Sequence, residues 1–267
     1  MTVIAHLSDP HLDGTTEARD RLRRVTSYLL AFSRPVDVVL VTGDLADHGT
    51  EYDEVAAELA AFGDVPVLVL PGNHDVRPEF RTGLTAYVEP ALTDAGSAGA
   101  PSASGQLSAE DPVHQVRDVA GARFVLLDTT VPGEDHGLLS ADSLDWLDAA
   151  LAEPYDGPVF IAFHHPPVGL QHPTMDQWLL REPGQFAAVL RRHPVTALLA
   201  GHLHNGISTT YAGLPLLLAP GIRSSVPLTF EPPSPSGTLV DLTSPPGLAL
   251  HVHHPGIPLL TKFVQLT

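Results

Sequence analysis

Residues 38–44 read Val-Val-Leu-Val-Thr-Gly-Asp, an apolar run that ends in a glycine turn and a carboxylate. Similar apolar runs of four to six residues, rich in Val, Ile and Leu, recur through the first two thirds of the chain. They are Val3–Leu7, Val36–Val41, Val65–Leu70, Phe124–Leu127, Val159–Phe163 and Val195–Ala200. Runs that are apolar almost throughout are typical of strands buried on both faces of a sheet. We therefore expect each run to form a core strand.

Segments with helical periodicity lie between these runs. Their apolar stripes are Leu22, Val25, Leu29 and Phe32; Tyr52, Val55, Leu59 and Phe62; and Leu144, Leu147 and Leu151. Thr50 is the expected N-cap of the second helix, with Asp53 at the third helical position. Strands that alternate with helices in this way predict an α/β domain with a largely parallel core.

Two regions interrupt the alternation. Residues 92–112 are rich in Ala, Ser, Gly and Pro, which predicts a long surface loop, interpreted as a plain insertion rather than a flap over a site. After residue 205 short apolar runs are separated by Gly and Pro, and we expect a second, mostly antiparallel sheet there. The expected strands of that sheet are Ile207–Tyr211, Leu214–Leu218, Thr238–Leu242 and Leu248–Val252. No interdomain linker is evident, so residues 1–267 are expected to form one domain.

Composition narrows the classes of function. The chain carries 14 Lys and Arg against 31 Asp and Glu, a formal net charge of −17, and binding of a nucleic-acid polymer is not expected. It has no cysteine, which excludes disulfides, thiolate nucleophiles and sulfur-ligated metal sites. The N-terminal residues lack a signal-peptide pattern, and no apolar stretch approaches the roughly 20 residues of a membrane helix. A soluble cytoplasmic protein without membrane association is therefore expected.

Polar side chains follow five of the apolar runs. The segments are Ser8-Asp9-Pro10-His11, Thr42-Gly43-Asp44, Pro71-Gly72-Asn73-His74-Asp75, His164-His165-Pro166-Pro167 and Gly201-His202-Leu203-His204. Ligands of open α/β sheets bind at the carboxyl ends of the strands. If the five strands belong to one sheet, these side chains converge at one of its edges.

The converging set contains oxygen and nitrogen ligands only. Its members are Asp9, His11, Asp44, Asn73, His164, His202 and His204. Such ligands suit two Mn, Fe, Zn or Co ions, and a carboxylate such as Asp44 can bridge them. Each residue alone could equally be a cap, a turn residue or a polar group near the surface. The coincidence at five strand ends favours the metal site, because capping does not require His or Asp after five separate strands.

These blocks resemble the signature of the calcineurin-like metallophosphoesterases. The matching residues, in order, are Asp9-x-His11, Gly43-Asp44-x-x-Asp47-x-Gly49, Gly72-Asn73-His74-Asp75, His164-His165 and Gly201-His202-x-His204. The stretches between them resemble more narrowly the bacterial class III cyclic nucleotide phosphodiesterases. The residues that carry this narrower likeness are Leu7–Leu12, Asp128–Gly137, His164–Pro167 and Met175-Asp176 ahead of Phe186.

The resemblance implies a four-layer αββα sandwich of two mixed sheets, with a two-metal site at the strand ends. By this likeness Asp9, His11, Asp44 and His204 would hold one ion, and Asp44, Asn73, His164 and His202 would hold the other. His74 would be the catalytic imidazole. Asp75 would support His74 or its loop, and Asp47 would support the site.

The function implied is hydrolysis of a small phosphodiester, with 3′,5′-cyclic nucleotides as the favoured substrate, through attack of a metal-bound hydroxide. Glycerophosphodiesters and phosphomonoesters are the alternative substrates for the same constellation. The alternative of a different class is a non-catalytic scaffold with this fold. Related enzymes dimerise, which leaves a homodimer open, although no apolar stripe in the sequence identifies an interface.

Several other polar residues have weaker interpretations. Arg77 and Arg223 could contact a phosphate, although an ion pair is the favoured interpretation of each. His172 could line a substrate pocket. His165 is expected to point away from His164 and to orient a neighbour. His251-x-His253 could bind a metal, but a solvated strand face is the favoured interpretation.

Overall fold

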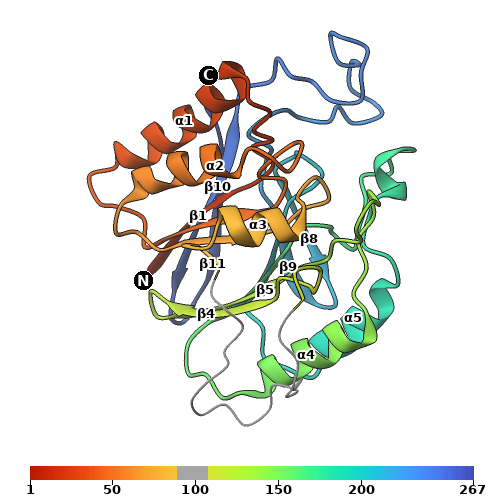
Figure 1. The fold of residues 1–267 in the computed structure, drawn as a ribbon. Helices are drawn as coiled ribbons and strands as arrows, with labels where there is room; N and C mark the ends of the chain where they lie inside the picture. The colour runs from red at the N-terminus through yellow and green to blue at the C-terminus, as the bar shows by residue number, and fades with distance from the viewer. Residues whose placement is uncertain (89–107) are drawn as a thin grey trace.

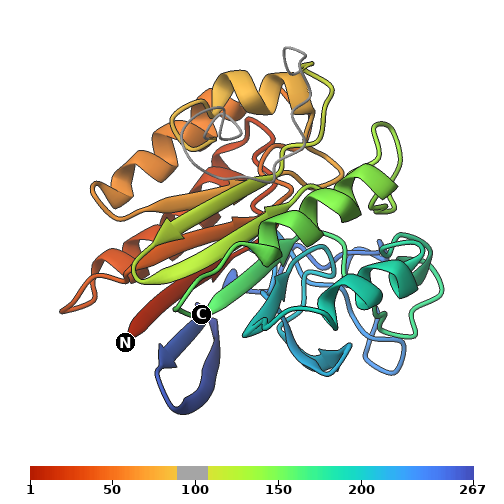
Figure 2. The same cartoon turned by 90° about the horizontal axis from the view of Figure 1, so that it is seen from below.

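The computed structural model describes residues 1–88 and 108–267 of the chain. Two mixed β-sheets pack face to face, and helices cover the outer face of each sheet (Figures 1 and 2). This arrangement confirms the α/β class and the four-layer αββα sandwich.

The first sheet has five strands in the order β11–β10–β1–β2–β3. They are β1 Thr2–Leu7, β2 Val38–Thr42, β3 Val67–Leu70, β10 Gly247–His254 and β11 Ile257–Gln265. The three N-terminal strands are parallel, while β10 runs antiparallel to β1 and β11 antiparallel to β10.

The second sheet has six strands in the order β4–β5–β6–β7–β9–β8. They are β4 Gln115–Val119, β5 Ala122–Leu127, β6 Val159–Phe163, β7 Ala197–Ala200, β8 Ile207–Tyr211 and β9 Leu214–Leu218. Its four inner strands are parallel, and the edge strands β4 and β8 are antiparallel to their neighbours.

Three apolar layers hold this stack together. Between the sheets, Ile4 and Leu40 of the first sheet belong to the same buried cluster as Phe124 and Phe160 of the second, and all four are 0% exposed. Strands buried on both faces need apolar residues at every position, which explains why the runs read as continuous rather than alternating.

Helices form the two outer layers. The first sheet is covered by α1 Thr16–Leu30, α2 Tyr52–Leu59, the 3₁₀-helix η1 Ala60–Phe62 and α3 Arg77–Gly83. The second sheet is covered by α4 Ala141–Ala152, the 3₁₀-helix η2 Met175–Gln177 and α5 Pro183–Leu190. Across the described ranges, no helix combines the length and the apolar character needed to cross a membrane.

The start of α2 differs from the expectation. Glu51, not Thr50, is the N-cap residue, and it makes no capping hydrogen bond through its side chain. The Thr50 hydroxyl donates instead to the Glu51 carboxylate, with the two oxygens 2.7 Å apart. Thr50 is therefore engaged as a donor to a charged neighbour, and Asp53 falls one position earlier in the first turn than expected.

The C-terminal strands also correct the sequence analysis. They do not form a separate antiparallel sheet: β8 and β9 extend the second sheet, and β10 and β11 extend the first. Thr238–Leu242 is not a strand, since only Asp241 pairs, with Ser225, in an isolated bridge. The edge strands β4 and β11 were not expected because their exposed faces interrupt the apolar pattern.

The predicted surface loop at 92–112 falls largely outside the described residues. Only its last part, 108–112, is described, and it forms an exposed turn closed by a hydrogen bond from Asp111 N to Ser108 O.

Candidate metal centre

The polar strand ends meet at one edge of the molecule, but they come from two sheets. Asp9, Asp44 and Asn73 follow β1, β2 and β3 of the first sheet, whereas His164 and His202 follow β6 and β7 of the second. The expectation of five strand ends in one sheet was therefore wrong. The side chains still converge, because the parallel strands of both sheets end at the same place.

The first cluster contains Asp9, His11, Asp44 and His204. One potential ligand atom from each of the four lies within 4.8 Å of the others, and all four residues are buried. His204 Nε2 lies 3.3 Å from Asp9 Oδ1, and His11 Nε2 lies 3.4 Å from Asp44 Oδ2. These are the residues that the resemblance implied for one ion.

The second cluster shares Asp44 with the first. His164 Nε2 lies 3.3 Å from Asp44 Oδ2, 3.1 Å from Asn73 Oδ1 and 3.2 Å from His202 Nδ1. The same Asp44 oxygen thus faces His11 in one cluster and His164 in the other. The structure brings all seven predicted ligands together, with Asp44 where a bridging carboxylate would lie.

Five of the seven candidate ligands have left-handed backbone conformations. Their φ angles are 54° for Asp9, 42° for His11, 52° for Asp44, 71° for His202 and 53° for His204. Such conformations cost on the order of 1–3 kcal/mol each for residues other than glycine and gather at functional sites. The turns after β1, β2 and β7 are therefore shaped to aim ligands rather than to minimise backbone energy.

Two glycines permit these turns to pack under the ligands. Gly43 has a φ of +91°, and a Cβ atom there would lie 2.4 Å from His164 Nδ1. A Cβ atom on Gly72 would lie 2.2 Å from Asp44 Oδ1. Any side chain at either position would displace a candidate ligand.

The imidazoles are oriented by partners on their other nitrogen. His11 Nδ1 donates to Asp47 Oδ1 at 2.9 Å, and His164 Nδ1 donates to Thr42 O at 2.7 Å. His204 Nδ1 lies 2.7 Å from Ser224 Oγ. Such contacts fix the tautomer and turn Nε2 toward a metal position. Ser224 was not predicted, because nothing in its local sequence connects it to a ligand 20 residues earlier.

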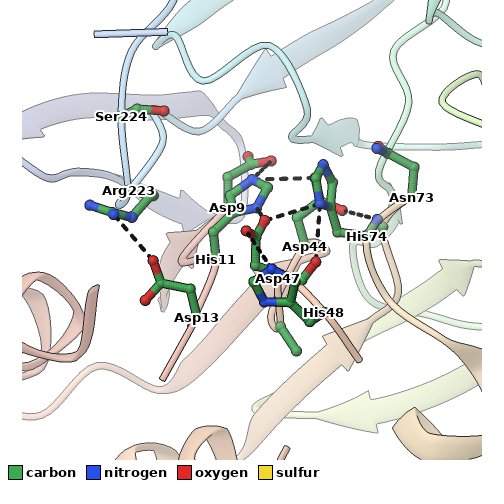
Figure 3. A network of polar contacts seen from close by, with 12 residues as sticks. Asp9, His11, Asp13, Asp44, Asp47, His48, Asn73, His74, Arg223 and Ser224 are labelled. Carbon is green, nitrogen blue, oxygen red and sulfur yellow. Dashed lines mark hydrogen bonds and ion pairs between the residues drawn. The ribbon is translucent and has the colours of Figure 1, made fainter. Parts of the chain in front are cut away.

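Asp47 also contacts His74, so one carboxylate supports a candidate ligand and the candidate catalytic imidazole (Figure 3). His74 Nδ1 lies 3.0 Å from Asp47 Oδ1, and this hydrogen bond raises the pKa of His74 to about 9. Bound metal cations would act in the opposite direction. The hydrogen bonds from His11 and His74 hold the pKa of Asp47 below its usual range.

Asp75 supports the loop and not His74. Its carboxylate accepts hydrogen bonds from the backbone of Leu45, Ala46 and Gly72 and from the Tyr52 hydroxyl. Burial and the nearby charge of Asp44 raise its pKa to about 7. Asp75 was expected to support either His74 or its loop. In the structure its carboxylate holds the loop backbone.

The donor set fits cations. Asp9 and Asp44 are 0% and 2% exposed, and although burial opposes their ionisation, neighbouring histidines hold the pKa of each below its usual range. Asp9 Oδ1 accepts no hydrogen bond from the described residues, and it faces the nitrogen of His204 that is turned away from Ser224. Two buried carboxylates this close together need positive charge beside them, which bound cations would supply.

His165 lies closer to the cluster than expected. Its ring centre is 4.7 Å from that of His202, and with His164 and His202 it forms a third set of possible metal donors. Its Nδ1 is 2.8 Å from Thr129 Oγ1. His165 was expected to point away from His164, but its ring lies 4.8 Å from that of His164 at a steep angle and also packs against His202.

A buried chain of polar groups runs beneath the cluster. His251 Nε2 is 3.1 Å from His6 Nδ1, and His6 Nε2 is 3.0 Å from the hydroxyl of Thr42, whose carbonyl accepts from His164. Both His6 and His251 are 0% exposed in the layer between the sheets. The preferred interpretation of His251 as part of a solvated face was wrong, and His6 was not singled out, because alternation alone does not reveal which face of β10 is buried.

A cavity of about 500 Å³ opens over the clusters and includes His74, Asp47 and Arg223 in its lining. Arg223 pairs with Asp13 and Glu17, as its ion-pair interpretation predicted, and Arg77 pairs with Asp128. Among the described residues that line the cavity, His172 is not included. Its Nδ1 accepts from Thr174 N and Met175 N, so it stabilises the η2 turn instead of lining the pocket.

Known proteins share these features. Residues 2–206 match the family model described as calcineurin-like phosphoesterase. A probable cyclic nucleotide phosphodiesterase of Rhodococcus erythropolis is 35% identical over 227 residues, which cover 81% of this chain and 69% of that protein. A cAMP/cGMP dual specificity phosphodiesterase of Mycobacterium tuberculosis is 33% identical, with 81% and 66% covered. A glycerophosphodiester phosphodiesterase of Enterobacter lignolyticus is 27% identical, with 93% and 86% covered.

Solved structures show the same fold at low identity. A purple acid phosphatase of yellow lupin aligns with a TM-score of 0.66 at 13% identity, covering 99% of this chain and 51% of that one. GAP50 of Plasmodium, described as an anchor in the inner membrane complex, aligns with a TM-score of 0.57 at 12% identity, covering 99% and 84%. From the family match and the cyclic nucleotide phosphodiesterase relatives, we conclude that this chain belongs to the calcineurin-like phosphoesterase family and is a metal-dependent phosphoric ester hydrolase.

Proposed function

We propose that the protein is a two-metal phosphodiesterase for small diesters, with 3′,5′-cyclic nucleotides as its substrates. The observation that carries this proposal is the convergence of seven candidate ligands and His74 beneath one cavity. Asp9, His11, Asp44 and His204 would hold one ion, and Asp44, Asn73, His164 and His202 the other. Fe, Mn, Zn and Co suit this mixture of imidazole and oxygen donors.

A bound metal pair would neutralise charge on the phosphoryl oxygens and lower the pKa of the attacking water. The other steps belong to side chains of this chain. Breaking the P–O3′ bond of a cyclic diester leaves an alkoxide on O3′, which needs a proton. His74 lines the cavity, and its contact with Asp47 through Nδ1 leaves Nε2 as the nitrogen that can donate this proton.

Asp47 supports this role in two ways. Its hydrogen bond fixes the orientation of the His74 ring and favours the protonated form that an acid catalyst needs at neutral pH. The same carboxylate also positions His11, so the proton donor and one candidate ligand share an anchor. Asp47 is therefore a positioning residue for both.

The test combines metal analysis with substrate turnover. The purified protein should contain about two transition-metal ions per chain, one for each of the two proposed ligand sets. Turnover of cyclic AMP, glycerophosphocholine and 4-nitrophenyl phosphate should then be compared, with cyclic AMP the preferred substrate. Preference for the monoester would keep the metal site and overturn the diesterase proposal.

A second candidate is hydrolysis of glycerophosphodiesters. It is favoured by the Enterobacter relative, whose similarity extends over 93% of this chain. Preference for glycerophosphocholine in the same assay would select it. A non-catalytic scaffold would neither bind two metals nor turn over any of the three esters.

A further inference from the structure

The cavity above the metal clusters is lined by two chemically different groups of residues. The first is the metal floor, which we define as Asp9, His11, Asp44, Asn73, His164, His202 and His204; all of these except Asp9 and His164 line the cavity directly. The second is a set of six apolar side chains, which line the cavity together with polar residues such as Asp135 and Ser224. We call this set the apolar wall, and it consists of Met175, Trp178, Val226, Leu239, Val240 and Leu242.

Two segments far apart in sequence build the apolar wall. Met175 and Trp178 come from the η2 turn, in which Trp178 N donates to Met175 O at 3.0 Å. The remaining four residues come from the segment between β9 and β10, which includes the isolated bridge of Ser225 with Asp241. The wall therefore does not depend on a regular strand or a long helix.

The wall is nevertheless fixed relative to the metal floor. Arg223 N donates to Asp9 O at 3.0 Å, and Asn205 Nδ2 donates to Val226 O at 2.8 Å. Asn205 directly follows the candidate ligand His204. Both hydrogen bonds tie the start of the wall segment to turns that carry ligands.

Arg21 of α1 holds the two ends of this segment together. Its guanidinium donates to Ile222 O at 2.8 Å, to Leu242 O at 3.3 Å and to Ser244 O at 2.6 Å. The wall is thus present before a substrate arrives, which reduces the conformational entropy lost on binding.

The apolar wall is chemically suited to a flat apolar group. Met175 is only 4% exposed but lines the cavity, and Met sulfur contacts aromatic rings favourably. Trp178 offers a stacking surface, and stacking on an aromatic side chain is tolerant of base identity. A glycerol headgroup would leave these apolar side chains in water, and a quaternary ammonium is held by several aromatic rings, whereas the wall has one.

We propose that the apolar wall is the nucleobase subsite of this enzyme, with the base against Trp178 and Met175 while the phosphate lies over the metal floor. This inference rests on the proposed phosphodiesterase function, because the phosphate fixes where the rest of the substrate can reach. It identifies the substrate class as nucleotides of either purine or pyrimidine type.

The first experiment compares cyclic AMP with its abasic counterpart, 1-deoxyribose 3′,5′-cyclic phosphate. Wild-type protein should favour cyclic AMP by about 10-fold or more in kcat/KM, as expected for one stacked base. Trp178→Ala should remove about 10-fold from kcat/KM for cyclic AMP, mainly through KM, and leave the abasic diester unchanged. Trp178→Phe keeps a stacking ring and should restore most of the loss.

An equal loss for both diesters would show that Trp178 is only structural and would overturn the proposal. Undiminished turnover of cyclic AMP by Trp178→Ala would also overturn it. A wild type that prefers glycerophosphocholine, with the preference lost in Trp178→Ala, would assign the wall to a cationic headgroup instead.

The second experiment measures binding without turnover. The chain has two tryptophans, and Trp146 stacks on His114 away from the cavity. Trp146→Phe therefore leaves Trp178 as the single indole fluorophore. Adenosine 5′-monophosphate should quench its emission saturably, whereas ribose 5-phosphate should not.

The two experiments separate the two levels of inference. If metal-loaded protein turns over monoesters but neither cyclic diester, the proposed diesterase function fails. Quenching of Trp178 emission by the nucleotide would still show whether the apolar wall binds a nucleobase. Absence of quenching by the nucleotide, in protein that retains its metals, overturns the nucleobase subsite alone.

Discussion

The metal floor and the apolar wall enclose the same cavity, but they are built by different means. The floor residues sit on turns directly after core strands, and most have left-handed backbone conformations with orienting hydrogen bonds. The wall residues come from a 3₁₀ turn and an irregular segment, and Leu242 is 40% exposed. Core strands, tight turns and orienting hydrogen bonds together fix the positions of the floor side chains. The wall side chains are held in place by only a few tertiary hydrogen bonds.

This difference separates the reaction from the choice of substrate. Reacting groups tolerate little displacement, so they are placed on rigid strand ends. Groups that contact only the variable part of a substrate can lie on loops, where substitutions leave the scaffold intact. Substitutions in the floor should therefore affect every substrate, and substitutions in the wall should affect only substrates with a base.

Asp44→Ala should give the largest effect, because Asp44 faces both clusters through one carboxylate oxygen. Metal content should fall, and turnover of every ester should drop by about 10³-fold or more. Elemental analysis and turnover of both a cyclic and an abasic diester would check this. A loss confined to substrates with a base would break the distinction between floor and wall.

His74→Ala should retain the metals but lose about 10²-fold in turnover, since in the proposed mechanism His74 donates the proton and belongs to neither ligand set. His48→Gln is the matched control, because His48 is an exposed imidazole on the neighbouring loop and does not line the cavity. Metal loss in His74→Ala with little change in rate would assign His74 to the ligands instead.

Asp47→Asn should lower turnover by about 10-fold when metals are supplied in excess, because it removes an orienting partner of two imidazoles. It should also lower the pKa of His74, because it removes the hydrogen bond to Asp47 that raises this pKa, so the alkaline limb of the rate profile should move to lower pH. Rates measured from pH 6 to pH 10 would show the shift. Asp13→Asn, on the same cavity but paired with Arg223, should leave the limb in place.

His251→Gln tests the layer under the floor and should affect stability more than turnover. Burial lowers the pKa of His251 to about 3, whereas in the unfolded chain it is about 6.5. Between these values the unfolded chain binds a proton that the folded protein does not, so the free energy of unfolding falls as the pH falls. His251 should contribute about 1.4 kcal/mol per pH unit to this slope, and the variant should lose that contribution.

Denaturant unfolding at several pH values between 4 and 6.5 would measure this slope, which spans the range set by the ordinary and lowered pKa of His251. His254→Gln serves as the control, because His254 lies on the same strand but is exposed. An unchanged slope in His251→Gln would mean that His6 or another buried group carries the proton linkage.

The sequence predicted the floor because each part of it is local. A strand end followed by Asp or His is visible in a few residues, and the rule that strand ends converge supplies the rest. What it could not show is the division between sheets, because β10 pairs with β1 across more than two hundred residues and no local pattern records that pairing.

The wall and, apart from Asp47, the groups that orient the imidazoles were beyond prediction for the same reason. Ser224 and Val226 become part of the site only through tertiary contacts with His204 and Asn205. The carbonyl of Thr42 has no sequence signature at all, since every residue carries one. Irregular segments lack the periodicity from which placement can be inferred.

The position of the metal floor between the two sheets has a consequence for folding. His11 and His204 lie 193 positions apart and follow strands of different sheets, yet their Nε2 atoms are 3.3 Å from each other. An ion held by both would close a loop as a disulfide does, and a cross-link of that span stabilises by about 5 kcal/mol in the chain-entropy model. In a chain without cysteine, metals bound at this site would thus also cross-link the N-terminal part of the polypeptide to its C-terminal part.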